Sequence, residues 1–160
     1  MNESPAAAPD PGDRRIAIVV SRFNEVATGR LAAGARTCLL ERGFAADRID
    51  EFWVPGAFEL PLAADRLAAR GVYDAVIALG CVIRGETPHF EFVSAETARG
   101  LGEVALRHGL PVAFGVLTTD DAEQAMARAG GKHGNKGWEA AEAALEMIGF
   151  LERVARMAGA

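Results

Sequence analysis

Four short apolar runs, separated by segments of helical periodicity, restrict the fold of this chain more than any other feature. The runs occupy residues 16–20, 52–54, 75–79 and 112–117. A continuous apolar run of this length is typical of a strand that is buried on both faces. Because strands that alternate strictly with helices are joined by right-handed crossovers, we predict an α/β fold. In this fold a four-stranded parallel sheet forms the middle layer of a three-layer sandwich, with helices on both faces.

The segments between the runs place apolar residues at the spacing of a helix face. The three stripes are Leu31, Ala35, Cys38 and Leu39; Leu60, Ala63, Ala64, Leu67 and Ala68; and Phe90, Val93, Thr97, Leu101, Val104 and Ala105. Gly43, Gly71 and Gly109 follow the stripes in the positions expected of C-terminal caps. After the last strand we expect a short helix over about 122–129, a glycine-rich break over 130–137 and a long helix from Trp138.

The length and composition indicate one folded domain with a separate N-terminal arm. The chain has 160 residues, of which 50% are hydrophobic and 24% charged, as in a globular domain with a core of its own. Residues 1–13 contain three of the seven prolines and little that could be buried, so we predict a flexible arm there. Residues 14–160 contain no linker and are predicted to form one domain.

Charge and cysteine content exclude several classes of function. The net charge of −5 argues against a nucleic-acid binder, which usually carries a basic face. Cys38 and Cys81 are far apart, so we expect neither a disulfide framework nor a cysteine-rich zinc site, and this usage fits the cytoplasm. With three histidines and no HExxH motif, we expect no structural metal site. No apolar run approaches the roughly 20 residues of a membrane span, and the N-terminus lacks the apolar region of a signal peptide.

The carboxyl ends of the predicted strands are the expected place for a ligand, because loops at this edge of a parallel sheet converge. The third such loop, residues 84–89, has the composition of an anion site. Gly85 allows close approach of the backbone, Thr87 is a good N-cap, and Pro88 suits the first helical position. The helix N-terminus would direct N–H groups at a phosphate, and it would favour a neutral His89 that can accept a proton.

Each of these residues also has a purely structural interpretation. The pair Thr87 and Pro88 could merely start a helix with His89 on its surface, and the two interpretations of this loop are evenly balanced. The acidic Glu86 counts slightly against a phosphate beside it. In the neighbouring loops, the Glu59 carboxylate could simply interact favourably with the dipole at the start of a helix. When Glu59 is considered alone, this structural explanation is the better one. Phe23 could stack on a flat ring or lie at the edge of the core.

The basic residues around the glycine-rich break are ambiguous in the same way. Arg128, Lys132 and Lys136 could hold a phosphate or could be there for the helix dipole. The break is not a GxxxxGK[ST] loop, and no GxGxxG follows the first strand, so a dinucleotide fold is poorly supported. Cys81 and His108 are interpreted as structural residues.

Several of these stretches together resemble one family, the 6,7-dimethyl-8-ribityllumazine synthases of riboflavin biosynthesis. The resemblance covers nearly all of residues 15–150. It is carried by SRFNEVATGRLAAGA, WVPGAFELPLAA, DAVIALGCVIRGETPHFEFV, PVAFGVLTTDDAEQAMARAG and KHGNKGWEAAEAALEM. The combination of GAFE, GCVIRGETPHF and GNKGWEAA is highly specific.

The resemblance implies an enzyme that needs no metal or organic cofactor. Its substrates would be 5-amino-6-(D-ribitylamino)uracil and L-3,4-dihydroxy-2-butanone 4-phosphate, and its catalytic residue would be His89, which would transfer protons. The implied substrate-binding residues are Phe23 against the pyrimidine, Ala57 and Phe58 in the site wall, Glu59 on the ribityl hydroxyls, Val82 and Ile83 at the uracil edge, Gly85, Glu86 and Thr87 around the phosphate, and Phe114, Arg128 and Lys136 from a neighbouring subunit. Arg128 would be the phosphate's counter-charge.

The resemblance also implies a flavodoxin-like topology and self-assembly. The segment before the first strand would extend the sheet of a neighbouring subunit, and five subunits would form a pentamer. The break at residues 130–137 carries no insertion, which favours closure of twelve pentamers into a 60-subunit shell. Riboflavin synthase is a candidate partner, whereas nucleic acid and membranes are not expected.

Two other classes of function stay open at this point. The chain could be a shell protein or a binder of riboflavin-like ligands that has kept the fold, but such a protein would be expected to lose His89 or Glu59, and both are present. It could also be a flavodoxin-like FMN binder, but SRFNEVATG is a poor phosphate loop for that function.

Overall fold

The structure, a computed structural model, describes residues 8–157 and has one main sheet. Strands β1 (Ile16–Ser21), β2 (Ile49–Val54), β3 (Ala75–Ile83) and β4 (Val112–Thr119) are all parallel. Their order in the sheet is β2-β1-β3-β4. The chain therefore leaves β1 toward one side and later returns to its other side, which leaves a crevice at the carboxyl ends of β1 and β3.

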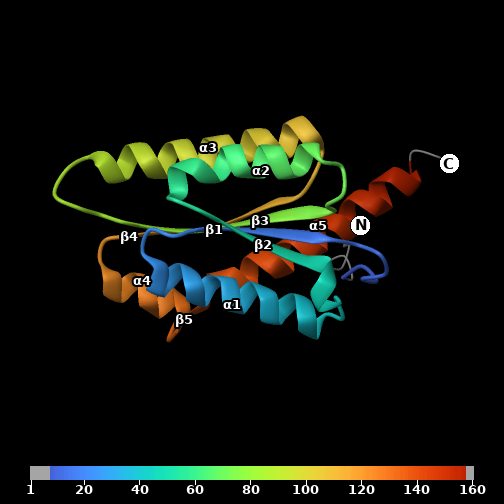
Figure 1. Ribbon diagram of the computed structural model, residues 1–160, viewed down its shortest axis with the longest axis horizontal. Coiled ribbons are helices and arrows are strands. Elements are labelled where there is room, and N and C mark those ends of the chain that lie inside the picture. Colours follow the sequence, from blue (N-terminus) through green and yellow to red (C-terminus); the bar gives the residue numbers. More distant parts are fainter. Residues whose placement is uncertain (1–7, 158–160) are drawn as a thin grey trace.

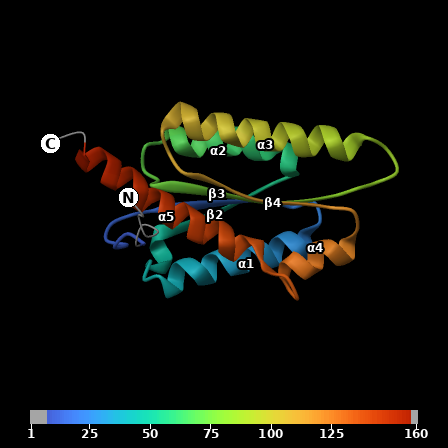
Figure 2. The ribbon, with the colours of Figure 1, turned by 180° about the vertical axis from the view of Figure 1, so that it is seen from behind.

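Helices cover both faces of this sheet (Figures 1 and 2). Helices α2 (Leu60–Ala69) and α3 (His89–His108) lie on one face. Helices α1 (Glu25–Glu41), α4 (Ala122–Arg128) and α5 (Lys136–Met157) lie on the other. The predicted three-layer sandwich with a four-stranded parallel sheet is confirmed.

The remaining elements are short connections. Two single turns of 3-10 helix, Ala46–Arg48 and Ala57–Glu59, flank β2. Strands β5 (Ala129–Gly131) and β6 (Gly134–Asn135) form a small antiparallel hairpin between α4 and α5. This hairpin occupies most of the predicted glycine-rich break.

Alternation along β1 divides the core into two layers. Ile16, Ile18 and Val20 pack on the side of α1 and α5, whereas Ala17 and Val19 pack on the side of α2 and α3. All five are fully buried, as are residues 75–79 of β3. The central strands thus confirm the expectation of two-sided burial.

The same expectation is wrong for the run at residues 52–54. Strand β2 is an edge strand, so its helical cover is incomplete. Phe52 remains 38% exposed, and its ring meets the edge of the Tyr73 ring with centroids 6.4 Å apart. An apolar run identifies a strand but does not reveal its place in the sheet.

Backbone conformation at the helix ends confirms the predicted glycine caps. Gly43, Gly71 and Gly109 have φ angles of +94°, +69° and +59°, a region that favours glycine. The predicted N-terminus of α3 needs a correction. The helix begins at His89, preceded by Pro88, and no side-chain oxygen of Thr87 caps it.

The last helix also begins earlier than predicted, at Lys136 instead of Trp138. The cause is Asn135, whose Oδ1 accepts hydrogen bonds from the N–H groups of Gly137 and Trp138. Its amide nitrogen donates to the carbonyl of Arg30 in α1 at 3.0 Å. One asparagine therefore both starts α5 and joins it to α1.

The described part of the predicted N-terminal arm makes local contacts. Arg48 pairs with Asp13, and Arg14 bonds to the Asp10 carbonyl and to Glu152 of α5. Residues 1–7 lie outside the described residues, so the flexibility of the arm stays a prediction. Among residues 8–157, no helix combines the length and apolar character that crossing a bilayer requires.

Candidate active site

Backbone hydrogen bonds hold the loops at the carboxyl edge of the sheet together in pairs. The N–H groups of Arg22 and Phe23 donate to the carbonyls of Val54 and Pro55, at 2.8 and 3.0 Å. The Arg84 N–H donates to the Thr119 carbonyl at 2.8 Å. The pairing of the strands thus continues one or two residues into the loops, which fixes their relative positions.

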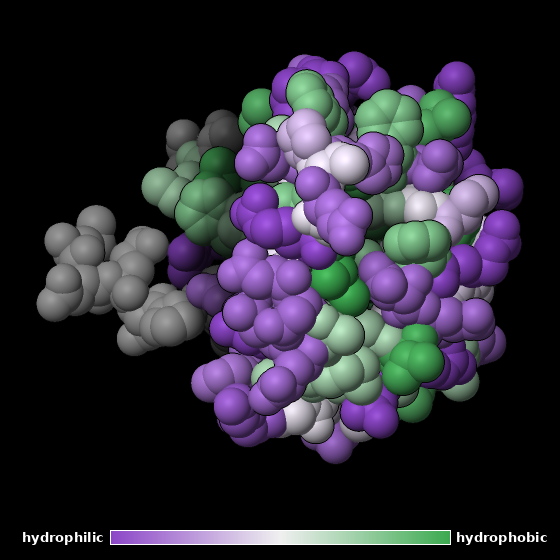
Figure 3. All heavy atoms as spheres, turned by 90° about the vertical axis from the view of Figure 1, so that its left-hand side faces the viewer, coloured by the Kyte–Doolittle hydropathy of each residue, from purple (hydrophilic) through white to green (hydrophobic). Residues whose placement is uncertain are grey.

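Between these loops and α3 lies a cavity of about 610 Å³. Figure 3 looks onto this end of the molecule, where apolar side chains reach the surface among hydrophilic ones. The cavity is lined by Phe23, Gly56, Ala57, Phe58, Glu59, Cys81, Val82, Ile83, Gly85, Thr87, His89, Phe90, Phe92, Val93 and Glu96. Its volume is in the range of small-molecule sites.

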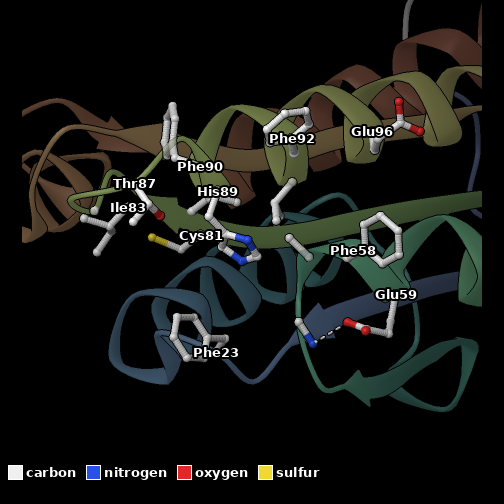
Figure 4. Close-up of a pocket in the computed structure, with 15 residues that line it drawn as sticks. Phe23, Phe58, Glu59, Cys81, Ile83, Thr87, His89, Phe90, Phe92 and Glu96 are labelled. Carbon is white, nitrogen blue, oxygen red and sulfur yellow. Dashed lines mark hydrogen bonds between the residues drawn. The ribbon is translucent and has the colours of Figure 1, made fainter.

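Nine of the thirteen predicted site residues line this one cavity. They are Phe23, Ala57, Phe58, Glu59, Val82, Ile83, Gly85, Thr87 and His89. They come from the ends of β1, β2 and β3 and from the start of α3, so segments more than sixty residues apart in the sequence converge here (Figure 4). The structure confirms the predicted convergence for the loops that follow β1, β2 and β3.

The other four predicted residues do not line the cavity. Glu86 is exposed on the loop before α3. Phe114 on β4 lines a separate apolar groove of about 460 Å³ between α3 and α5. Arg128 donates to the Gln124 carbonyl at 3.1 Å, and Lys136 pairs with Glu139 at 2.6 Å. The last three were expected to reach the site of a neighbouring subunit, which a single chain does not test.

His89 is the first residue of α3, and its ring points from the helix into the cavity toward Phe23 (Figure 4). The residue is exposed, so water and a bound molecule can reach the ring nitrogens. Helix α3 has 20 residues, and its N-terminal end adjoins Gly85 and Thr87 on the cavity wall. A proton acceptor and a site that favours negative charge are therefore neighbours.

Glu59 has the structural role that the sequence suggested, and it also faces the cavity. One carboxylate oxygen accepts a hydrogen bond from the Gly56 N–H at 3.0 Å, drawn as the dashed line in Figure 4. This contact satisfies the backbone N–H at the start of the turn before α2; Gly56 has no side chain that could complete a capping box. A carboxylate has acceptor sites for several further donors, so the capping contact leaves capacity for hydroxyl groups.

Two aromatic rings stand exposed at the mouth of the cavity. Phe23 is 72% exposed and Phe58 61% exposed, so Phe23 does not lie at the edge of the core. The loop that carries Phe23 is held by Asn24, which adopts a left-handed conformation with φ +62°. The Asn24 side chain donates to the carbonyl of Cys81 on β3 at 2.9 Å. This bond fixes the Phe23 loop against the central strand.

Sequence reasoning missed the part of the cavity wall that α3 supplies. These α3 residues are Phe90, Phe92, Val93 and Glu96. Gly56 and Cys81, from other elements, also line the cavity and were not predicted as site residues. Phe90 and Val93 were assigned only to the core stripe of the helix. Phe92 is 69% exposed, and an aromatic residue on the polar face of a helix is the signal that could have indicated a site.

Cys81 lines the cavity but is nearly fully buried. Burial raises the pKa of its thiol to about 11, so the sulfur is protonated at neutral pH. A protonated thiol is a poor nucleophile, in keeping with the structural role expected for Cys81.

The order of the strands and the position of the cavity define a class: a flavodoxin-like α/β protein with a cavity beyond the carboxyl ends of its parallel sheet. A family model described as 6,7-dimethyl-8-ribityllumazine synthase matches residues 13–152, which leaves only the two ends of the chain unmatched. The chain belongs to this family. The family resemblance stated from the sequence motifs is thereby confirmed.

Proposed function

We propose that this protein condenses 5-amino-6-(D-ribitylamino)uracil with L-3,4-dihydroxy-2-butanone 4-phosphate to 6,7-dimethyl-8-ribityllumazine, with release of phosphate and water. The family itself belongs to riboflavin biosynthesis, and its enzymes are of the transferase type. The observation that carries the proposal is the convergence of His89, Glu59 and the loop around Gly85 on one cavity. His89 can transfer protons, Glu59 can accept hydrogen bonds from hydroxyl groups, and the loop around Gly85 can bind an anion. A reaction between a polyol-bearing ring and a small phosphate ester uses all three properties.

The uracil substrate occupies the part of the cavity between Phe23 and the end of β3. The exposed ring of Phe23 stacks on the pyrimidine, and Val82 and Ile83 border its edge. The ribityl chain runs toward Ala57 and Phe58, where the free acceptor capacity of the Glu59 carboxylate takes hydrogen bonds from its hydroxyl groups.

The phosphate ester lies at the other end, against Gly85, Glu86 and Thr87. The N-terminus of α3 favours its negative charge, and backbone N–H groups of the loop bind its oxygens. The Glu86 side chain is exposed, so this residue contributes through its backbone. Within one chain Arg128 lies elsewhere, and we propose that Arg128, Lys136 and Phe114 of a neighbouring subunit complete the site.

The chemistry consists of proton transfers between two held molecules. The amine of the uracil attacks the ketone and forms an imine with loss of water, phosphate is then eliminated, and the ring closes with loss of a second water. His89, directed into the cavity, accepts and returns protons in these steps. No step needs a nucleophilic side chain, so much of the rate increase comes from holding the two substrates in contact.

The proposal includes assembly in the cytoplasm into pentamers and then into a 60-subunit shell, with riboflavin synthase as a candidate partner. Strand β2 is an edge strand, so its outer side is available for pairing with the N-terminal segment of a neighbouring subunit. The connection between α4 and α5 is a short hairpin, Ala129–Asn135, which leaves room for contacts between pentamers.

The proposed activity is tested by mixing the purified protein with both substrates and following the absorbance and fluorescence of the lumazine. We expect product to form well above the rate of the spontaneous reaction measured without protein. A matched sample that lacks the phosphate ester should stay without product. Tight binding of lumazine or riboflavin with no increase in rate would show a ligand-binding protein instead of an enzyme.

A further inference from the structure

The side chain of Arg84 spans the loop that leads into α3. Its Nε lies 3.0 Å from Oδ1 of Asp120 in the β4–α4 loop. Its Nη1 lies 3.6 Å from Oε1 of Glu91 in the first turn of α3. The guanidinium carbon lies 4.5 Å from the centroid of the Phe90 ring. One side chain therefore contacts the β4–α4 loop and both sides of the helix start.

The backbone of the same residue is held as well, since its N–H donates to the Thr119 carbonyl at 2.8 Å. The loop over Gly85 and Thr87 is thus fixed at its first residue by the backbone. At its far end it is fixed by the Arg84 side chain, through Phe90 and Glu91. His89 lies between these two attachment points, and Phe90 itself lines the cavity (Figure 4).

These contacts contribute little to the stability of the fold. The Arg84 side chain is 47% exposed and both carboxylates are 67% exposed, and ion pairs with that exposure contribute little to folding. The Arg84 side chain does not line the cavity and is engaged by Asp120, Glu91 and Phe90. What the three contacts do is restrict the conformations of residues 85–91 relative to the sheet.

We infer that Arg84 is a positioning residue that holds the phosphate-binding loop and His89 in place for the reaction; this inference rests on the proposed function. The planar guanidinium suits the role, because it can stack on Phe90 while its edge bonds to Asp120. A lysine keeps the charge but has neither the plane nor the fork of donors.

Steady-state kinetics of Arg84→Ala test the inference. We expect kcat to fall and KM for the phosphate ester to rise, each by about tenfold, with KM for the uracil nearly unchanged. Arg84→Lys should recover less than half of the loss. Asp120→Asn should share the defect, and the double variant should be little worse than Arg84→Ala alone. Full recovery with lysine, or an equal rise of both KM values, would overturn the inference.

The matched control is Arg42→Ala. Arg42 also forms an exposed ion pair, to Glu142 at 2.6 Å, with a side chain that is 41% exposed, but it lies at the far end of α1. Its removal should leave both KM values and kcat unchanged. If Arg42→Ala reproduced the kinetic defect of Arg84→Ala, the effect would be a general one and the inference would fail.

Amide hydrogen exchange provides a measurement that does not depend on activity. In Arg84→Ala, peptides that cover residues 85–91 should exchange about tenfold faster than in the wild type, with β1 unchanged. Unchanged exchange over 85–91 would refute the positioning role even if the enzyme is active. A wild-type protein without activity would refute the proposed function, while the exchange data would still decide whether Arg84 holds the loop.

Discussion

At the scale of single residues, His89 is the proposed proton-transfer group. Its ring enters the cavity from the first residue of α3, next to the loop assigned to phosphate. His89→Ala should lower kcat by about a hundredfold or more, because one general acid–base group is lost, while assembly and substrate binding persist. His133→Ala is the control, since His133 lies in the exposed hairpin away from the cavity. Turnover that survives His89→Ala intact would remove this residue from the mechanism.

Arg128 is the residue whose role depends on a second chain. Its own-chain contact is a single bond to the Gln124 carbonyl. Arg128→Ala should weaken binding of the phosphate ester about tenfold to a hundredfold, because a charge-assisted bond to phosphate contributes roughly 1.5–3 kcal/mol. Binding of the uracil, measured by calorimetry, should change little. Equal weakening of both substrates would make Arg128 a structural residue.

At the scale of elements, the close packing of α5 on α1 depends on Gly137. A Cβ there would lie 1.9 Å from the carbonyl oxygen of Leu31. Gly137→Ala must therefore push the two helices apart, and we expect a loss of about 1–3 kcal/mol in the free energy of unfolding by denaturant. Gly102→Ala in α3 is the control, because a Cβ there meets nothing within 4 Å. A Gly137→Ala protein as stable as the wild type would contradict this packing.

Helices α2 and α3 are joined by the Asp65 carboxylate, which bonds to His108 at 2.8 Å and to Arg107 at 2.9 Å. The hydrogen bond from His108, and then that from Arg107, lowers the pKa of Asp65. A carboxyl group whose pKa is lower in the folded state stabilises the fold at pH values above its pKa in the unfolded chain, about 3.9. This stabilisation is lost as the pH falls through the pKa of the folded state. Asp65→Asn should lower the free energy of unfolding by about 1 kcal/mol at pH 7. The difference in this free energy between the variant and the wild type should shrink below about pH 4. A constant difference over this range would contradict the assignment.

The sequence predicts elements better than it predicts their edges and partners. The runs at 16–20 and 75–79 are buried on both faces because they are central strands, whereas Phe52 is exposed because β2 is at the edge. The helix α5 begins two residues earlier than predicted because the Oδ1 of Asn135 caps it. The amide nitrogen of the same side chain donates to the carbonyl of Arg30, a partner that is distant in sequence.

Local chemistry marked the loop at Gly85 and His89 as a candidate anion site, evenly balanced against a structural interpretation, and the structure places both residues on the cavity. The α3 wall with Phe92 was missed because periodicity assigns a helix face to core or solvent and not to a cavity. Phe114 and Lys136 could not be placed on the cavity by any reasoning about a single chain, because they lie elsewhere in it.

At the scale of the whole molecule, we predict a site shared between subunits and a closed shell. Light scattering at neutral pH should show a particle of about 1 MDa. A particle of about 85 kDa, five times the 16.9 kDa chain, would show pentamers without closure.

The shared site is tested by mixing Arg128→Ala and His89→Ala subunits before assembly. Part of the activity should be restored, since some sites then receive both intact residues. No recovery in demonstrably mixed particles would contradict a site shared between chains.

In the proposed reaction the cavity joins the two substrates and expels phosphate in the same cycle. The most direct test is to measure lumazine and inorganic phosphate in one reaction, after subtraction of a blank without protein. We expect one phosphate released for each lumazine formed, with both products dependent on the presence of both substrates. Lumazine that accumulates no faster than in the blank, or phosphate released without the uracil substrate, would contradict it.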